Sequence, residues 1–240
     1  MSSNLPLFDT CAHPTLDGRW LDRNEYSCSF SELSEQLSQN GFVGSCAVGL
    51  AGLNGYSHQG FAEACDAYPN LVPIAGVNPK LESPETVLSL KEMGYKGIKL
   101  HPRFSEFSLQ EDKAVLQALL AAAEEVGLIV FWCSYEYCGI SKMPKRPLLY
   151  DFSEVIAPFP NLKHVIMHAG GIHLMSWVEL TRFNPNLLLD LSLVLTKYEG
   201  SSIDQDLKYV FEKFDQRICL GSDYPEWTHQ KIRERFDYFA

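Results

Sequence analysis

The stretch from Gly97 to Cys133 decides the fold, because it holds two strand patterns with a strong helix pattern between them. Gly97–His101 (GIKLH) and Leu128–Cys133 (LIVFWC) are short apolar runs of strand length, and Asp112–Val126 has a helix-forming core rich in Ala and Leu. Gly127 stands directly after this helix, where a helix C-cap is expected. A strand–helix–strand unit of this kind predicts two neighbouring parallel strands.

The same alternation continues along the chain in both directions. Further helices are predicted at Ser31–Asn40, at Thr86–Met93 and at Glu226–Phe239, and Pro84 after Ser83 marks a helix start. Eight strand–helix units without a glycine-rich phosphate motif after the first strand favour a closed (β/α)8 TIM-like barrel of the α/β class over an open sheet. No linker divides the chain, so residues 1–240 are predicted to form one domain. The predicted strands are Leu5–Cys11, Phe42–Val48, Leu71–Val77, Gly97–His101, Leu128–Cys133, His164–His168, Leu187–Leu191 and Ile218–Asp223.

Composition excludes several classes of partner. The net charge of −10 disfavours nucleic acid and an anionic membrane surface, and no run of 18 apolar residues is present to span a bilayer. Seven scattered cysteines and the absence of a signal-peptide pattern at the start predict a reduced, cytoplasmic protein. The partner expected is a small-molecule substrate, and a homo-oligomer is compatible with the sequence.

Polar residues gather where four of the predicted strands end. A lone histidine in a strand is more often a core residue than a ligand, but four strands ending in this way point to one shared site. Because all eight strands of a barrel deliver their C-terminal ends to the same mouth, these clusters should converge there. They are Asp9-Thr-Cys11-Ala-His13, Lys99-Leu-His101-Pro-Arg103, His168-Ala-Gly-Gly171 and Gly221-Ser-Asp223-Tyr-Pro225.

In this order, the motifs resemble the amidohydrolase-2 branch of the amidohydrolase superfamily. That branch includes aminocarboxymuconate-semialdehyde decarboxylase and lactonases of the pyrone-dicarboxylate type. The resemblance runs from Leu5 to Pro225 and includes Tyr68–Pro79 at the third strand. It implies a hydrolase of a small lactone, cyclic amide or similar carboxylate-bearing substrate, with decarboxylation of a small unsaturated acid as the alternative on the same scaffold.

Two cysteines depart from the family pattern. Family members carry Asp-x-His-x-His on the first strand, whereas this chain has Cys11 in place of the first histidine, and Cys133 stands where the fifth strand usually supplies another. Three interpretations stay open: a thiolate metal site, catalysis without a metal, or a catalytically silent binding protein. A reversible disulfide between the two cysteines would also explain the pattern. In the first interpretation Cys11, His13, Cys133 and Asp223 bind one divalent metal ion, and Zn²⁺ suits that donor set best.

The resemblance also suggests roles for individual residues. Asp223 would bind the metal and take a proton from the attacking water, and His168 would polarise the substrate carbonyl or orient the water. Without a metal, His13, His101, His168 and Asp223 would act by acid–base chemistry. Lys99, His101 and Arg103 form a cationic cluster suited to a substrate carboxylate or phosphate, although Lys99 could instead form an internal salt bridge, for example to Asp9.

Overall fold

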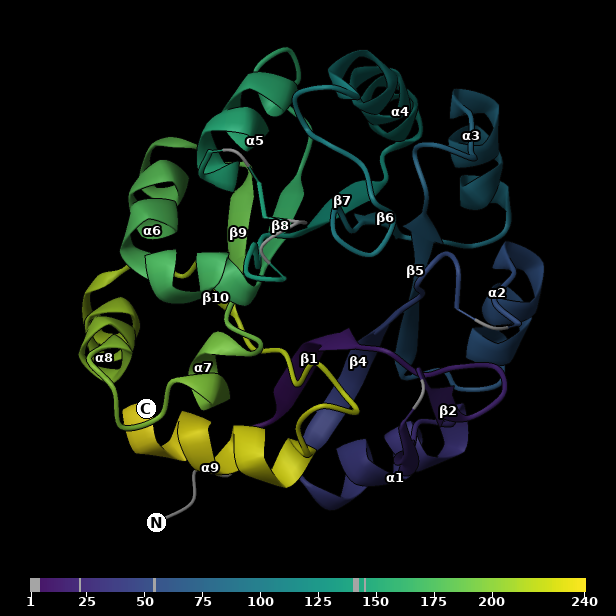
Figure 1. The fold of residues 1–240 in the computed structure, drawn as a ribbon. Coiled ribbons are helices and arrows are strands. Elements are labelled where there is room, and N and C mark those ends of the chain that lie inside the picture. The colour runs from purple at the N-terminus through teal and green to yellow at the C-terminus, as the bar shows by residue number, and fades with distance from the viewer. Residues whose placement is uncertain (1–4, 22, 54, 140–142, 145) are drawn as a thin grey trace.

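Eight parallel strands form one sheet that runs in chain order around the molecule (Figure 1). The computed structural model describes residues 5–21, 23–53, 55–139, 143–144 and 146–240. Each strand pairs with the next along the chain in parallel register. The strands are β1 (Leu7–Ala12), β4 (Phe42–Val48), β5 (Leu71–Val77), β6 (Gly97–Leu100), β7 (Ile129–Cys133), β8 (His164–Met167), β9 (Leu187–Asp190) and β10 (Ile218–Cys219).

The sheet closes between its first and last strands. Thr10 N donates to Leu220 O at 2.8 Å, His13 N to Tyr224 O at 2.8 Å, and Asp223 N to Cys11 O at 2.7 Å. These bonds tie β1 to the chain that continues beyond β10, so no open edge remains between them. The barrel predicted from the sequence is therefore confirmed, and the open doubly wound sheet is excluded.

Helices surround this barrel as an outer ring (Figure 1). The order strand–helix–strand is the one predicted from the apolar periodicity, and α4 ends at Gly127, which has a left-handed φ of 68°. The helix predicted at Glu226–Phe239 begins three residues later, where the Thr228 side chain accepts from Lys231 N. The helices are α1 (Phe30–Gln39), α2 (His58–Asp66), α3 (Pro84–Glu92), α4 (Lys113–Val126), α5 (Leu148–Ile156), α6 (Leu174–Phe183), α7 (Val194–Lys197), α8 (Ile203–Lys213) and α9 (His229–Phe239).

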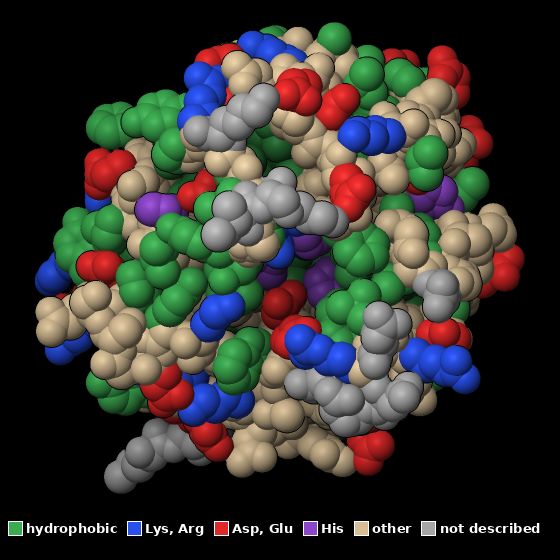
Figure 2. Space-filling view, viewed as in Figure 1, with side chains coloured by type: hydrophobic (Ala, Val, Ile, Leu, Met, Phe, Trp, Pro, Cys, Tyr) green, Lys and Arg blue, Asp and Glu red, His purple; other side chains and the backbone are tan. Residues whose placement is uncertain are grey.

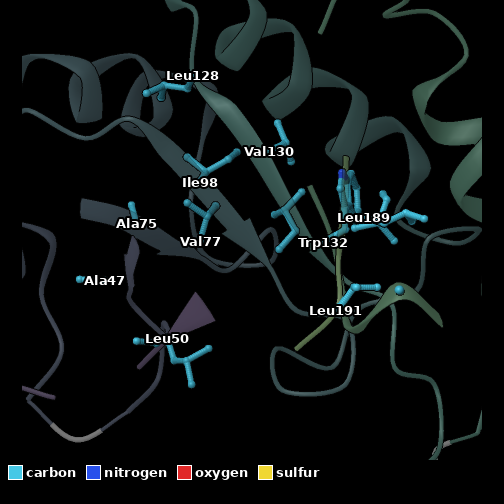
Figure 3. Close-up of a cluster of buried hydrophobic side chains, with 14 of the residues drawn as sticks. Ala47, Leu50, Ala75, Val77, Ile98, Leu128, Val130, Trp132, Leu189 and Leu191 are labelled. Atoms are coloured by element: carbon cyan, nitrogen blue, oxygen red, sulfur yellow. The ribbon is translucent and has the colours of Figure 1, made fainter. Parts of the chain in front are cut away.

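Strand periodicity separates two apolar layers. Outward-facing residues such as Ile98, Val130 and Trp132 pack against the helices and belong to the large core (Figure 3). The intervening residues, such as Phe131 and Met167, point into the barrel and form a second, smaller cluster. Because the side-chain period of a strand is two, a residue's place in this alternation decides whether it can reach the barrel mouth.

Within the described part of the chain, four short elements lie outside the eight units and were not predicted. β2 (Arg19–Trp20) and β3 (Arg23–Ser27) form an antiparallel hairpin after β1. A 3-10 turn, η2 (His168–His173), follows β8, and the four-residue helix α7 follows β9. Among the described residues, every helix is too short or too polar to traverse a bilayer.

Candidate active site

A cavity of about 510 Å³ opens where the strands end. His13, His101, His168 and Asp223 line it together with the basic side chains of Arg103 and others, and Figure 2 shows histidine, acidic and basic side chains gathered in the hollow at the centre of this face. The structure therefore brings these predicted strand-end residues together at one mouth of the barrel.

Three side chains from the two sides of the barrel closure form a compact trio. His13 Nε2 lies 3.4 Å from Asp223 Oδ1, Cys11 Sγ lies 3.5 Å from the same oxygen, and Cys11 Sγ lies 3.7 Å from His13 Nε2. Asp223 has a left-handed φ of 53°, which turns its carboxylate toward the two residues of β1 and the loop after it. One nitrogen, one sulfur and one oxygen donor thus converge within 4.8 Å of one another.

The orientation of His13 is fixed by the backbone. Its Nδ1 lies 2.7 Å from Val48 O, and because a carbonyl only accepts, Nδ1 carries a hydrogen. Nε2 therefore faces Asp223 and Cys11, and its contact with the carboxylate is favourable when a positive charge, either a proton or a metal ion, lies between the two. A backbone carbonyl that fixes the ring tautomer is also the usual support of a metal-binding histidine.

Opposing effects set the charges in the trio. Burial alone would raise the pKa of Asp223, but His168, His13 and Lys99 outweigh burial and hold the pKa well below its usual range. Burial, reinforced by Asp223, raises the pKa of the Cys11 thiol well above its usual range. The carboxylate is therefore ionised at neutral pH, and Cys11 keeps its proton unless a cation displaces it.

The trio fits a tetrahedral zinc ion. Ordinary Zn–S, Zn–N and Zn–O bond lengths place tetrahedral ligand atoms about 3.4 to 3.6 Å apart, close to the separations of 3.4, 3.5 and 3.7 Å found here. Three protein donors leave a fourth position for water or substrate, as in catalytic zinc sites. The donor types, their spacing and the fixed His13 tautomer all agree with such an ion.

Cys133 does not belong to this trio. Arg103 Nη2 lies 3.8 Å from its sulfur. Burial alone would raise the pKa of Cys133, but His101 and His168 outweigh burial and hold the pKa well below its usual range. The four-ligand set expected from the sequence is therefore not assembled in this structure, and all seven cysteines, Cys11 and Cys133 included, are free of disulfide bonds.

His168 is held by polar residues that follow β9. Its Nδ1 lies 2.9 Å from Ser192 Oγ, and the Ser192 hydroxyl donates to Asp190. Because that hydroxyl hydrogen is already engaged, Nδ1 of His168 is the donor in the pair. Burial alone would lower the pKa of His168, but Asp223 and Cys133 outweigh burial and raise the pKa.

The predicted cationic cluster is only partly at the mouth. His101 and Arg103 line the cavity, whereas Lys99 does not; it is 1% exposed inside the barrel, with Nζ 2.7 Å from Met167 Sδ. Lys99 precedes His101 by two residues and so points inward one layer below the strand ends. Asp9, the suggested salt-bridge partner of Lys99, pairs instead with His229 Nε2 at 2.8 Å.

A family model for amidohydrolases matches residues 24–240. The chain belongs to the amidohydrolase family. Its strand-end motifs are those of the amidohydrolase-2 branch, as predicted, with Cys11 and Cys133 as this amidohydrolase's own departures from the pattern. No curated protein sequence matches the chain.

Solved structures resemble this amidohydrolase in fold at low sequence identity. An uncharacterised TIM-barrel protein from Bordetella bronchiseptica is 16% identical, with a TM-score of 0.75 over 97% of this chain and 90% of that one. A protein from Pseudomonas putida assigned as a 2-pyrone-4,6-dicarboxylic acid hydrolase is 19% identical, with a TM-score of 0.68 over 98% and 90%. Dihydroorotase from Campylobacter jejuni is 16% identical, with a TM-score of 0.60 over 98% and 77%. These likenesses establish the barrel and not the substrate.

The structure also adds residues to the site of this amidohydrolase that sequence reasoning missed. Lys197 Nζ lies 2.9 Å from Tyr135 Oη and 4.7 Å from the centre of its ring, while Arg103 lies 5.0 Å from the centre of the same ring. Lys197 comes from α7, a helix too short to predict. Asp190 and Ser192, at the end of the seventh predicted strand, formed a fifth polar strand end that could have been recognised.

Proposed function

We propose that the protein hydrolyses an ester, lactone or cyclic amide bond of a small carboxylate-bearing substrate in the 510 Å³ cavity. The observation that carries the proposal is the ionised Asp223 carboxylate, 3.4 Å from His13 Nε2, on the wall of a cavity that also holds basic side chains. A fixed proton acceptor beside a cationic binding surface is the arrangement that hydrolysis of an anionic substrate requires.

Asp223 is the proposed proton acceptor for the attacking water. Its carboxylate is ionised at neutral pH because the surrounding cationic groups outweigh its burial. Its orientation is fixed by the backbone bond from Asp223 N to Cys11 O, so little reorganisation is needed when water arrives. His168, which also lines the cavity, would orient the water or polarise the carbonyl through its Nε2, since Nδ1 is engaged with Ser192.

Arg103 and Lys197 are the proposed carboxylate-binding residues. Both line the cavity and both contact the Tyr135 ring, which fixes the two cations on the same wall. Arg23 also lines the cavity, but its guanidinium lies 3.0 Å from Glu226, which offsets its charge. A substrate carboxylate held at Arg103 and Lys197 would place the rest of the molecule toward Asp223.

Cys11, His13 and Asp223 would hold a divalent metal ion, and zinc is the ion that their donor set favours. Such an ion would supply Lewis acidity and lower the pKa of a bound water. The chain contributes the fixed His13 tautomer and the carboxylate charge. The neighbours assigned as pyrone-dicarboxylic acid hydrolase and dihydroorotase support the substrate class by their names alone.

The proposal is tested with a panel of lactones, cyclic amides and esters, each with and without a free carboxylate, alongside unsaturated carboxylic acids. We expect hydrolysis of carboxylate-bearing members and a loss of at least about 100-fold in kcat/KM for Asp223→Asn. Evolution of CO2 from the acids without hydrolysis would favour decarboxylation instead. If metal-loaded protein hydrolysed no member of the panel, that result would contradict the proposal and favour a binding protein.

A further inference from the structure

A second cavity of about 220 Å³ lies beside the main cavity and has no part in the hydrolysis proposed above. Arg103 and Tyr135 line both cavities, and the Arg103 guanidinium lies 5.0 Å from the centre of the Tyr135 ring. Cys133, the last residue of β7, also lines the second cavity, so this space belongs to the same mouth of the barrel. The stacked Arg103–Tyr135 pair therefore stands between two neighbouring parts of one mouth.

Hydrogen bonds within the chain hold the walls of the second cavity in place. In the loop after β6, Phe107 N donates to Pro102 O at 3.1 Å. In the segment after β7, Glu136 Oε2 accepts from Leu148 N, at the start of α5, at 2.8 Å. The cavity is therefore largely formed before a ligand arrives, as binding pockets usually are.

Six apolar side chains dominate what the second cavity offers to a ligand. Its two buried carboxylates already have partners, because Glu136 Oε1 lies 3.1 Å from His173 Nε2 and Asp151 accepts from Arg146. Polar groups with satisfied hydrogen bonds add little to binding, whereas apolar surface is stabilised by each apolar group that removes it from water. The six residues are Pro102, Phe107, Leu109, Met143, Pro144 and Leu148.

Arg103 connects the second cavity to the proposed carboxylate site. Its Nε is buried and has no hydrogen-bond partner among the described residues, although buried donors are nearly always paired in folded proteins. A substrate carboxylate held at Arg103 and Lys197 would bring acceptor oxygens to this guanidinium, at the junction of the two cavities. A substituent on the carbon next to that carboxylate would then face the second cavity, while the bond to be broken lies toward Asp223.

We infer that the second cavity binds an apolar substituent, about the size of a phenyl ring, on the carbon that carries the substrate's carboxylate. The inference rests on the proposed hydrolase function and narrows its substrate class to acids with such a substituent. Apolar cavities of about 150 Å³ are known to hold benzene, so the volume is sufficient. Leu109 and Leu148, which are 3% and 9% exposed, are the buried leucines that limit the size of this space.

Isothermal titration calorimetry of the full-length protein with succinate and with each enantiomer of 2-phenylsuccinate tests the inference without requiring turnover. The probes share two carboxylates and differ by one phenyl ring on the carbon next to a carboxylate. Wild type should bind one enantiomer of 2-phenylsuccinate at least about tenfold more tightly than succinate, because the ring leaves water. On the hydrolysis panel, a phenyl group beside the carboxylate of a lactone should raise kcat/KM by about the same factor.

Variants that fill the second cavity locate the ring. Leu109→Trp should bring the dissociation constants of succinate and 2-phenylsuccinate to within about twofold of each other. Leu148→Trp is a second variant of the same kind, and an unchanged succinate affinity in either one establishes that the main cavity is intact. Leu81→Trp is the matched control, because it makes the same change at an exposed leucine that lines neither cavity, and it should keep the preference for the phenyl group.

Three outcomes would overturn the inference. They are a wild type that binds none of the probes, a wild type that binds succinate as tightly as both enantiomers of 2-phenylsuccinate, and a preference that persists in both Leu109→Trp and Leu148→Trp. Hydrolysis of the panel without the preference would remove the second cavity from the substrate site and leave the proposed function standing. The preference without hydrolysis of any panel member would do the reverse.

Discussion

His164 makes a quantitative prediction about stability and pH. It is 2% exposed at the start of β8, and its Nδ1 accepts from Trp132 Nε1 at 3.1 Å. Because the indole nitrogen only donates, His164 is neutral with its hydrogen on Nε2, and Nε2 has no partner among the described residues. Burial accordingly lowers the pKa of His164 from the ordinary 6.5 to about 4.

The folded state therefore binds a proton at His164 less readily than the unfolded state does. The stability associated with neutral His164 is fully present above about pH 6.5 and is lost as the pH falls toward about 4. At 1.36 kcal/mol per pKa unit, the change amounts to about 3 kcal/mol. His164→Gln keeps an acceptor for Trp132 but cannot titrate, so it should abolish this part of the pH dependence.

Urea unfolding of both proteins at intervals between pH 7.5 and 4 measures the effect. All other groups titrate alike in the two proteins, so their contributions cancel in the difference in unfolding free energy between wild type and His164→Gln. We expect wild type to lose about 3 kcal/mol relative to the variant across this range. A difference that stays constant with pH would refute the assignment of a neutral, buried His164.

Two further predictions concern the active site. Lys197→Met should raise KM for a carboxylate-bearing substrate by about tenfold, because it removes a charge-assisted hydrogen bond. KM for the methyl ester of the same substrate should stay unchanged. Steady-state kinetics on this matched pair of substrates measure both effects. Ser192→Ala should lower kcat by about tenfold, with little change in KM, because His168 loses the group that orients it. The limb of the pH–rate profile that reports His168 should move to lower pH, and Ser192→Thr should restore it.

The sequence predicted the barrel well because its signals are local. Apolar runs bounded by glycine and by helix caps located seven of the eight strands to within two residues, as with β4 and β5, whose bounds agree fully. The last strand is an exception: Ile218–Asp223 was predicted, whereas β10 ends at Cys219. The chain beyond Cys219 turns at Asp223, which has a positive φ.

The arrangement of side chains within the mouth was harder to predict. β1 and β7 lie on opposite sides of the barrel, with three strands between them in either direction, so strand periodicity cannot tell whether Cys11 and Cys133 meet. Strand periodicity places His168 on the same face as Ile166, but Ile166 packs outward against the helices. His168 reaches the cavity because its φ of 65° breaks the alternation at the end of β8.

Residues contributed by loops and by a distant helix could not be predicted from the sequence for the same reason. Lys197 lies on a four-residue helix, and its contact with Tyr135 joins positions 62 residues apart. His229 of α9 binds Asp9 from the opposite end of the chain. Neither contact has a periodicity or spacing that could be recognised in the sequence.

The separate roles of the two cysteines are tested most directly by zinc content. Protein purified without chelators and loaded with zinc should bind one ion per chain, measured by elemental analysis and native mass spectrometry. Cys11→Ala should lose this ion, because it removes one donor of the Cys11–His13–Asp223 trio, and Cys133→Ala should keep it. Equal loss in the two variants, or no zinc in wild type after loading, would contradict a metal-binding trio that excludes Cys133.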